Sequence, residues 1–170
     1  MNNRITADEL MQRGREHWDT GYEHVSEFAV YLSRVHELSF MRSEKVMDTF
    51  GLSSTEFDVL ASLRCSAPPH IMTPTELQRS MLITSGGLTK LLYQLEERDL
   101  ISRSVQEKDK RSKLVHLTAE GKGIIEKSMM ALLTDEDEWL KTVLNDKELK
   151  QLIKLLRKLN TALEDQLMKK

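Results

Sequence analysis

Cationic side chains are concentrated in one short segment of this 170-residue sequence. Between positions 103 and 113 there are five basic residues and two acidic ones, a local charge of +3, whereas the whole chain has a formal net charge of -2. The basic residues are Arg103, Lys108, Lys110, Arg111 and Lys113. Phosphate groups attract such a patch even on an otherwise acidic protein. This segment is therefore the first candidate for a nucleic-acid contact.

Sequence patterns typical of catalysis or metal binding are missing. Gly86-Gly87 does not follow a predicted strand, as a phosphate-binding loop would, and neither a nucleophile elbow nor a His-Glu-x-x-His pattern occurs. The five histidines show no tight metal-ligand spacing. We therefore expect no enzymatic activity, no cofactor and no metal site.

The only cysteine, Cys65, cannot form a disulfide within the chain. It lies late in a predicted core helix, which favours buried packing over redox sensing, because a sensor thiol needs solvent access. No apolar run approaches the ~18 residues of a membrane span. The N-terminus also lacks the apolar block of a signal peptide. These features predict a cytoplasmic protein that does not contact the membrane.

Two short helices precede the basic segment. Thr73 is expected to cap the first, at about residues 74–81, with Pro74 at its first position and Glu76 completing a capping box. The second has leucines at 88, 91, 92 and 95, a spacing that predicts one buried face. The opposite face carries Ser85, Gly86, Thr89, Lys90 and Tyr93. Two short helices with a tight polar turn indicate a helix-turn-helix, whose second helix enters the major groove of DNA.

The hydrophobic period changes after this second helix. Ile101, Arg103 and Val105 alternate with polar residues, and 114–117 is a second strand-like run. The charged segment 107–112 between them is expected to form the turn of a β-hairpin. A helix-turn-helix followed by a hairpin is the order of elements in a winged helix, so the basic residues would lie at the tip of the wing.

Amphipathic helices flank this unit on both sides. We expect a short helix at 6–18, a long one at about 22–48, and a final helix with a leucine-rich stripe from Leu149 to Leu167. So long an apolar face needs a partner, and an interface that combines the N-terminal helices with a second subunit is favoured. The predicted fold is mainly α with a small β-hairpin wing. The chain divides into dimerisation helices at 1–50, a winged helix-turn-helix at 51–118, and further dimerisation helices at 119–170.

The segment from Gly51 to Gly121 resembles the MarR family of winged-helix regulators. The matching stretches are Gly51-Leu52-Ser53, Phe57-Asp58-Val59-Leu60, Thr73-Pro74-Thr75-Glu76-Leu77, 88–96, Leu100-Ile101-Ser102-Arg103, Asp109-Lys110-Arg111-Ser112 and 115–121. For the family, the resemblance implies a homodimer with interlocked terminal helices that binds a pseudo-palindromic operator, usually as a repressor. It often also implies release from DNA by a small molecule.

The resemblance also implies roles for single residues. Arg111 would insert into the minor groove, where a narrow groove has a deep negative potential, and Asp109 would pair with it and orient its guanidinium. Lys110 stands where many members of the family have arginine. The residues expected to contact double-stranded DNA are Thr73, Thr75, Gln78, Ser85, Gly86, Thr89, Lys90, Tyr93, Lys108, Asp109, Lys110, Arg111, Ser112 and Lys113. The alternatives are that Asp109 and Arg111 only stiffen a turn, and that single residues of the set lie on a solvated face.

Three further residues, Trp18, Asp58 and Arg103, are similar to positions used by the urate-responsive subgroup of this family. A small aromatic or anionic effector could stack on the indole and pair with the guanidinium. The chain departs from this subgroup at Leu91, where the subgroup has an arginine. The alternative is that Asp58 and Arg103 form a structural ion pair and that Trp18 fills the dimer interface.

A winged helix can also bind other proteins, and the acidic balance of the chain would permit a protein-interaction module without sequence-specific DNA binding. The wing distinguishes the two functions. A protein-binding module has little need for Lys108, Lys110, Arg111 and Lys113 at one loop tip. DNA binding that weakens with salt would favour the regulator.

Overall fold

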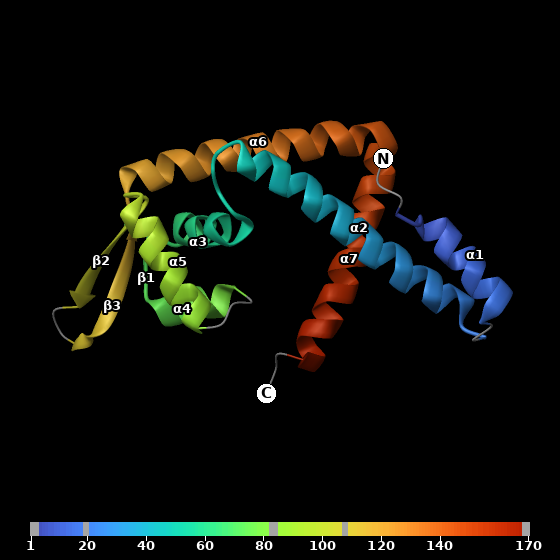
Figure 1. The fold of residues 1–170 in the computed structure, drawn as a ribbon, viewed down its shortest axis with the longest axis horizontal. Coiled ribbons are helices and arrows are strands. Elements are labelled where there is room, and N and C mark those ends of the chain that lie inside the picture. Colours follow the sequence, from blue (N-terminus) through green and yellow to red (C-terminus); the bar gives the residue numbers. More distant parts are fainter. Residues whose placement is uncertain (1–3, 19–20, 82–84, 107–108, 168–170) are drawn as a thin grey trace.

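The computed structural model describes residues 4–18, 21–81, 85–106 and 109–167, with the side chains of Ser85, Gln106 and residues 109–112 left outside that description. Figure 1 shows a lobe at one end of a long helix, α6, and an arm of helices at the other end. In chain order the elements are α1 (Ala7–His17), α2 (Glu23–Asp48), α3 (Ser54–Cys65), β1 (Ile71–Met72), α4 (Pro74–Ser80), α5 (Ser85–Glu97), β2 (Ile101–Gln106), β3 (Asp109–Leu117), α6 (Ala119–Val143) and α7 (Asp146–Leu167). This order confirms the predicted mainly α fold with a small β wing.

Helices α3, α4 and α5 form the winged lobe together with an antiparallel sheet in which β3 lies between β1 and β2. Arg103 on β2 pairs in register with Val115 on β3. The predicted apolar face of α5 is confirmed, because Leu88, Leu91, Leu92 and Leu95 are all buried. Met47 from α2 and Ile125 from α6 belong to the same core. Both long helices are therefore anchored in the lobe.

Side-chain caps mark the starts of several helices, including the cap that was predicted at Thr73. The Ser53, Thr73 and Thr118 hydroxyls each accept a hydrogen bond from the backbone N–H three residues ahead. The Asn145 Oδ1 atom accepts from the N–H groups of residues 147 and 148 at 3.0 and 3.1 Å, ahead of α7. Each cap satisfies N–H groups that a helix leaves unpaired at its start. The capping signals therefore fix where these helices begin.

The wing differs in one respect from its predicted form. The segment 107–112 was expected to be the turn, but β3 already begins at Asp109. Gln106 pairs with Asp109, and the register is irregular between Val105 and Gln106. Strand pairing between β2 and β3 therefore reaches as far as Asp109, a residue type that is common in turns, because ladder hydrogen bonds involve the backbone and not the side chain.

The arm exposes much of its apolar surface. In Figure 1, α2 and α6 diverge from the lobe, α7 crosses α2, and α1 lies at the far end of the molecule. No residue of α7 between Asp146 and Leu167 is buried. A groove of about 1050 Å³ between α2 and α7 is lined mainly by apolar side chains. They include Phe28, Tyr31, Leu32, Val35, Leu152, Leu155, Leu156 and Leu159.

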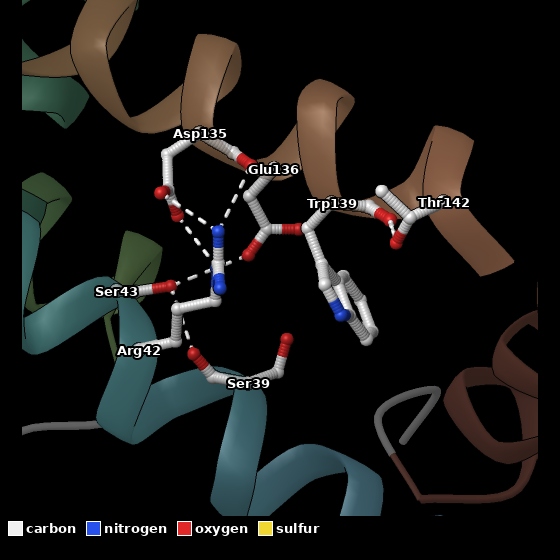
Figure 2. Close-up of polar contacts among 7 residues, drawn as sticks. All are labelled: Ser39, Arg42, Ser43, Asp135, Glu136, Trp139 and Thr142. Atoms are coloured by element: carbon white, nitrogen blue, oxygen red, sulfur yellow. Dashed lines mark hydrogen bonds and ion pairs between the residues drawn. The ribbon is translucent and has the colours of Figure 1, made fainter.

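One polar cluster joins α2 to α6 (Figure 2). The Arg42 Nε and Nη2 atoms donate to the two carboxylate oxygens of Asp135 at 2.7 and 2.8 Å. The Arg42 guanidinium also lies 5.9 Å from the centre of the Trp139 ring, a cation–π contact. Ser43, one residue along α2, donates to Glu136 at 3.4 Å. This cluster therefore fixes the two helices side by side at one point.

We expect a double-mutant cycle on Arg42→Ala and Asp135→Ala, measured by urea unfolding, to show a coupling energy of about 1 kcal/mol. The reason is that this bidentate ion pair is partly shielded from water. The control pair, Lys141 and Asp137, lies exposed along α6 and should couple by at most about 0.5 kcal/mol. Equal coupling in the two cycles would contradict a special role for the Arg42 cluster.

Candidate DNA-binding interface

Helix α4 is the supporting helix of the predicted helix-turn-helix. Thr73 precedes it, and its Oγ1 atom donates to Glu76 Oε2 at 2.9 Å while accepting from the Glu76 N–H at 3.2 Å. Hydrogen bonds from Thr73, the backbone N–H first, lower the pKa of Glu76. The Thr73 hydroxyl is thus already used by the cap, whereas Thr75 is exposed and Gln78 is half-buried. Thr75 is the member of this group most open to a DNA backbone.

Helix α5 presents the predicted polar face. Gly86, Thr89, Lys90 and Tyr93 are all exposed, opposite the buried leucines. The helix begins at Ser85, whose side chain lies outside the described atoms. The placement of this face agrees with the requirement that a recognition helix keeps one side free for the groove. Contact of each residue with DNA stays a prediction.

The wing carries the remaining predicted contacts. Lys113 is exposed on β3, opposite Val105 on β2. Lys108 lies outside the described residues, and so do the side chains of Asp109, Lys110, Arg111 and Ser112. The predicted pairing of Asp109 with Arg111 therefore stays a prediction. What the structure adds is that these four residues lie on strand β3.

Arg103 connects the wing to α5. Its Nε atom donates to Glu96 Oε2 at 2.7 Å, its Nη2 atom reaches the same oxygen, and its Cζ atom lies 4.1 Å from the centre of the Tyr93 ring. The hydrogen bond lowers the pKa of Glu96 and raises that of Arg103. The sequence analysis did not single out Glu96 as a partner of Arg103. The available signal was the i, i+3 spacing that places Tyr93 and Glu96 on one side of the helix.

The three candidate effector residues do not come together within one chain. Trp18 is the C-cap residue of α1 and is 78% exposed, Asp58 lies on α3, and Arg103 lies on β2. Figure 1 places α1 and β2 at opposite ends of the molecule. The alternative, an ion pair between Asp58 and Arg103, is wrong within the chain, since Arg103 pairs with Glu96. Partial burial alone raises the pKa of Asp58, with no contribution from an arginine.

Cys65 does not have its predicted buried position. It is the last residue of α3 and is exposed, whereas Phe57, Leu60 and Leu63 form the buried face of that helix. Cys65 follows Leu63 by two residues, so its side chain is rotated about 200° around the helix axis from that of Leu63 and points away from the core. Cys65 lines a surface hollow of about 950 Å³ between α3 and α6.

Within the part of the chain that the structure describes, no group of three or more histidine, cysteine or acidic side chains is arranged to hold a metal ion. None of the helices placed there has the length and apolar character needed to cross a bilayer.

The lobe has the architecture of a winged helix-turn-helix protein, with the exposed face of α5 next to the wing. The model of the MarR family matches residues 52–113. An uncharacterised HTH-type transcriptional regulator of Bacillus cereus is 30% identical over 129 residues, which cover 76% of this chain and 84% of the relative. The chain belongs to the MarR family.

Other relatives and solved structures agree with this assignment. The HTH-type transcriptional regulator PecS of Dickeya dadantii is 36% identical over 94 residues, 55% of this chain and 57% of PecS. The MarR C80S mutant from E. coli has a TM-score of 0.68 at 28% identity, covering 76% of this chain and 93% of that chain. The same mutant in complex with operator DNA has a TM-score of 0.66 at 25% identity, covering 92% and 99%.

Proposed function

We propose that this MarR family DNA-binding regulator works as a homodimer on a pseudo-palindromic operator, and that it is a ligand-responsive repressor. The observation that carries the proposal is the position of the exposed α5 face, which lies beside a wing whose segment has a local charge of +3. Helix α5 would enter a major groove and the wing would follow the adjacent minor groove. Two such lobes would contact successive major grooves roughly 34 Å apart.

Dimerisation is supported by the apolar surface of the arm. The groove between α2 and α7 exposes leucine and aromatic side chains in a protein whose lobe buries its own core. Covering such surfaces with a second copy removes them from water and is strongly favourable. We propose that α1, α2, α7 and the distal half of α6 form the interface, in keeping with the predicted dimerisation segments 1–50 and 119–170.

An effector that uses Arg103 would have to compete with the Glu96 carboxylate. A small aromatic anion has the necessary chemistry, since a second carboxylate-like group could take over the guanidinium. Trp18 could take part only if a second copy brings its α1 to the lobe, because one chain keeps α1 and β2 apart. The proposal for the effector therefore depends on the homodimer. Its effect would be to shift an existing equilibrium between lobe spacings.

The test is the selection of duplexes from a random-sequence DNA library, followed by fluorescence anisotropy at two salt concentrations. We expect one preferred, pseudo-palindromic sequence, with an affinity that falls about 10³-fold or more between 50 and 200 mM salt if six or more phosphates are contacted. The net charge of -2 favours the alternative of a protein-interaction module. Absence of any preferred sequence, with equally weak binding at both salts, would support that alternative.

A further inference from the structure

We infer that Arg103 is a positioning residue that locks the wing to the recognition helix and thereby sets the angle at which the two enter neighbouring grooves. The inference rests on the proposed DNA-binding function and adds a residue that sequence reasoning placed in an effector site. Arg103 lies at the base of the wing, on β2, and both of its side-chain partners lie on α5.

The contact is specific to the shape of an arginine. Its Nε and Nη2 atoms both reach Glu96 Oε2, while the flat face of the guanidinium covers the Tyr93 ring at 4.1 Å. A lysine would keep the charge but has neither the planar fork nor the face that stacks. The Arg103 side chain is only 18% exposed, so water competes weakly for these contacts. The pair is therefore better placed than an open surface ion pair to hold a fixed geometry.

Both ends of this contact continue into rigid structure. On the wing side, Arg103 pairs in register with Val115, which is fully buried in the core of the lobe. On the helix side, Tyr93 and Glu96 flank the buried Leu95, which fixes the rotation of α5. The same helical face continues towards Lys90 and Thr89, which are exposed for the major groove. Arg103 thus connects the two surfaces that would contact DNA.

A change at the base of the wing is amplified at its end. Gln106, three residues further along β2, lies roughly 10 Å beyond Arg103 at the rise of a strand. If the guanidinium releases α5, the strands can rotate about the base and the basic segment moves out of register with the minor groove. The expected consequence is loss of contacts in the flanking grooves, with the contacts of α5 in the major groove retained.

The experiment measures coupling between Arg103 and the DNA flanks. The probes are the selected duplex and a version shortened so that the flanking minor grooves are absent. For wild-type protein, shortening should weaken binding on the order of 1000-fold, because each wing of the homodimer loses its groove contact. Arg103→Lys should weaken binding to the full duplex by about 10-fold or more, and shortening should then weaken binding by a correspondingly smaller factor than in the wild type.

Arg64→Lys is the matched control. Arg64 forms a similar ion pair with Glu126 at 2.7 Å, but that pair joins α3 to α6, away from the wing. The Arg64→Lys variant should lose as much affinity as the wild type when the duplex is shortened. Glu96→Gln, which removes the charge at nearly constant size, should behave like Arg103→Lys with a smaller effect. Thermal unfolding of each variant verifies that the lobe remains folded.

The outcomes separate this inference from the proposed function. If Arg103→Lys and Glu96→Gln are folded and lose as much affinity as wild-type protein when the duplex is shortened, Arg103 does not position the wing and the inference is wrong. A residue that only stabilised the fold would give this result. The loss of affinity caused by the substitution and the loss caused by shortening the duplex would then be independent, and the two factors would multiply. If wild-type protein selects no preferred duplex, the proposed function is wrong, and the inference that rests on it is wrong as well.

Discussion

Replacement of Gly121 by alanine should lower the free energy of unfolding by about 3 kcal/mol, the upper part of the range for overpacked cores. A Cβ atom at this position would lie 2.0 Å from the carbonyl oxygen of Leu100 and 2.9 Å from its carbonyl carbon. The obstacle is backbone, which cannot rotate away as a side chain could. The same oxygen also accepts hydrogen bonds from the Thr118 N–H at 3.3 Å and hydroxyl at 3.0 Å. Moving it would disturb the start of α6.

Gly123→Ala is the control, two residues further along the same helix. Nothing lies within 4 Å of a Cβ atom built there, so alanine should stabilise the protein by up to about 1 kcal/mol through its higher helix propensity. Urea unfolding of the two variants beside wild-type protein measures both effects. The close approach of α6 to Leu100 would be refuted if the two alanines changed stability in the same direction and by similar amounts.

Arg111→Ala should cause the largest loss of DNA affinity among single substitutions in the wing. Loss of one groove contact costs about 2 kcal/mol, and a homodimer loses two, so the affinity for the selected duplex should fall on the order of 1000-fold. The structure places Arg111 on β3, between Asp109 and Lys113, which both pair with β2. Fluorescence anisotropy at constant salt, on selected and random duplexes, measures the loss of affinity and of specificity together.

Two variants show whether the effect depends on the guanidinium or only on charge. Arg111→Lys keeps the charge and should recover only part of the affinity, because a lysine does not fit a narrow groove as an arginine does. Lys113→Ala removes an exposed cation from the same strand and should weaken binding to all duplexes by a similar, small factor. If Arg111→Ala behaved like Lys113→Ala, the insertion of Arg111 into the minor groove would be wrong.

Much of the fold follows from local patterns. The i, i+3, i+4, i+7 spacing of Leu88, Leu91, Leu92 and Leu95 predicted the buried face of α5, and the cap at Thr73 predicted where α4 starts. Both kinds of signal involve residues within one or two helical turns of each other, so they can be identified from the sequence alone. The same locality explains why the order of helices and strands, and with it the winged fold, was predicted correctly.

The sequence did not determine which residues become neighbours across elements. Glu96 looks like any charged residue on a solvated face, and only the packing of β2 against α5 brings Arg103 to it. Nothing in the sequence around Gly121 indicates that the backbone of Leu100 leaves no room for a larger residue there. Cys65 was placed in the core because its helix is a core helix, but its angular position turns it outwards.

The sequence by itself therefore determined the elements, their buried faces and the family to which this chain belongs. The tertiary structure decided the connection between wing and recognition helix, and it separated Trp18 from Arg103 within one chain. The physical reason is the range of the interactions involved. Periodicity and capping are set by residues a few positions apart, whereas an ion pair or a close backbone approach depends on how whole elements pack.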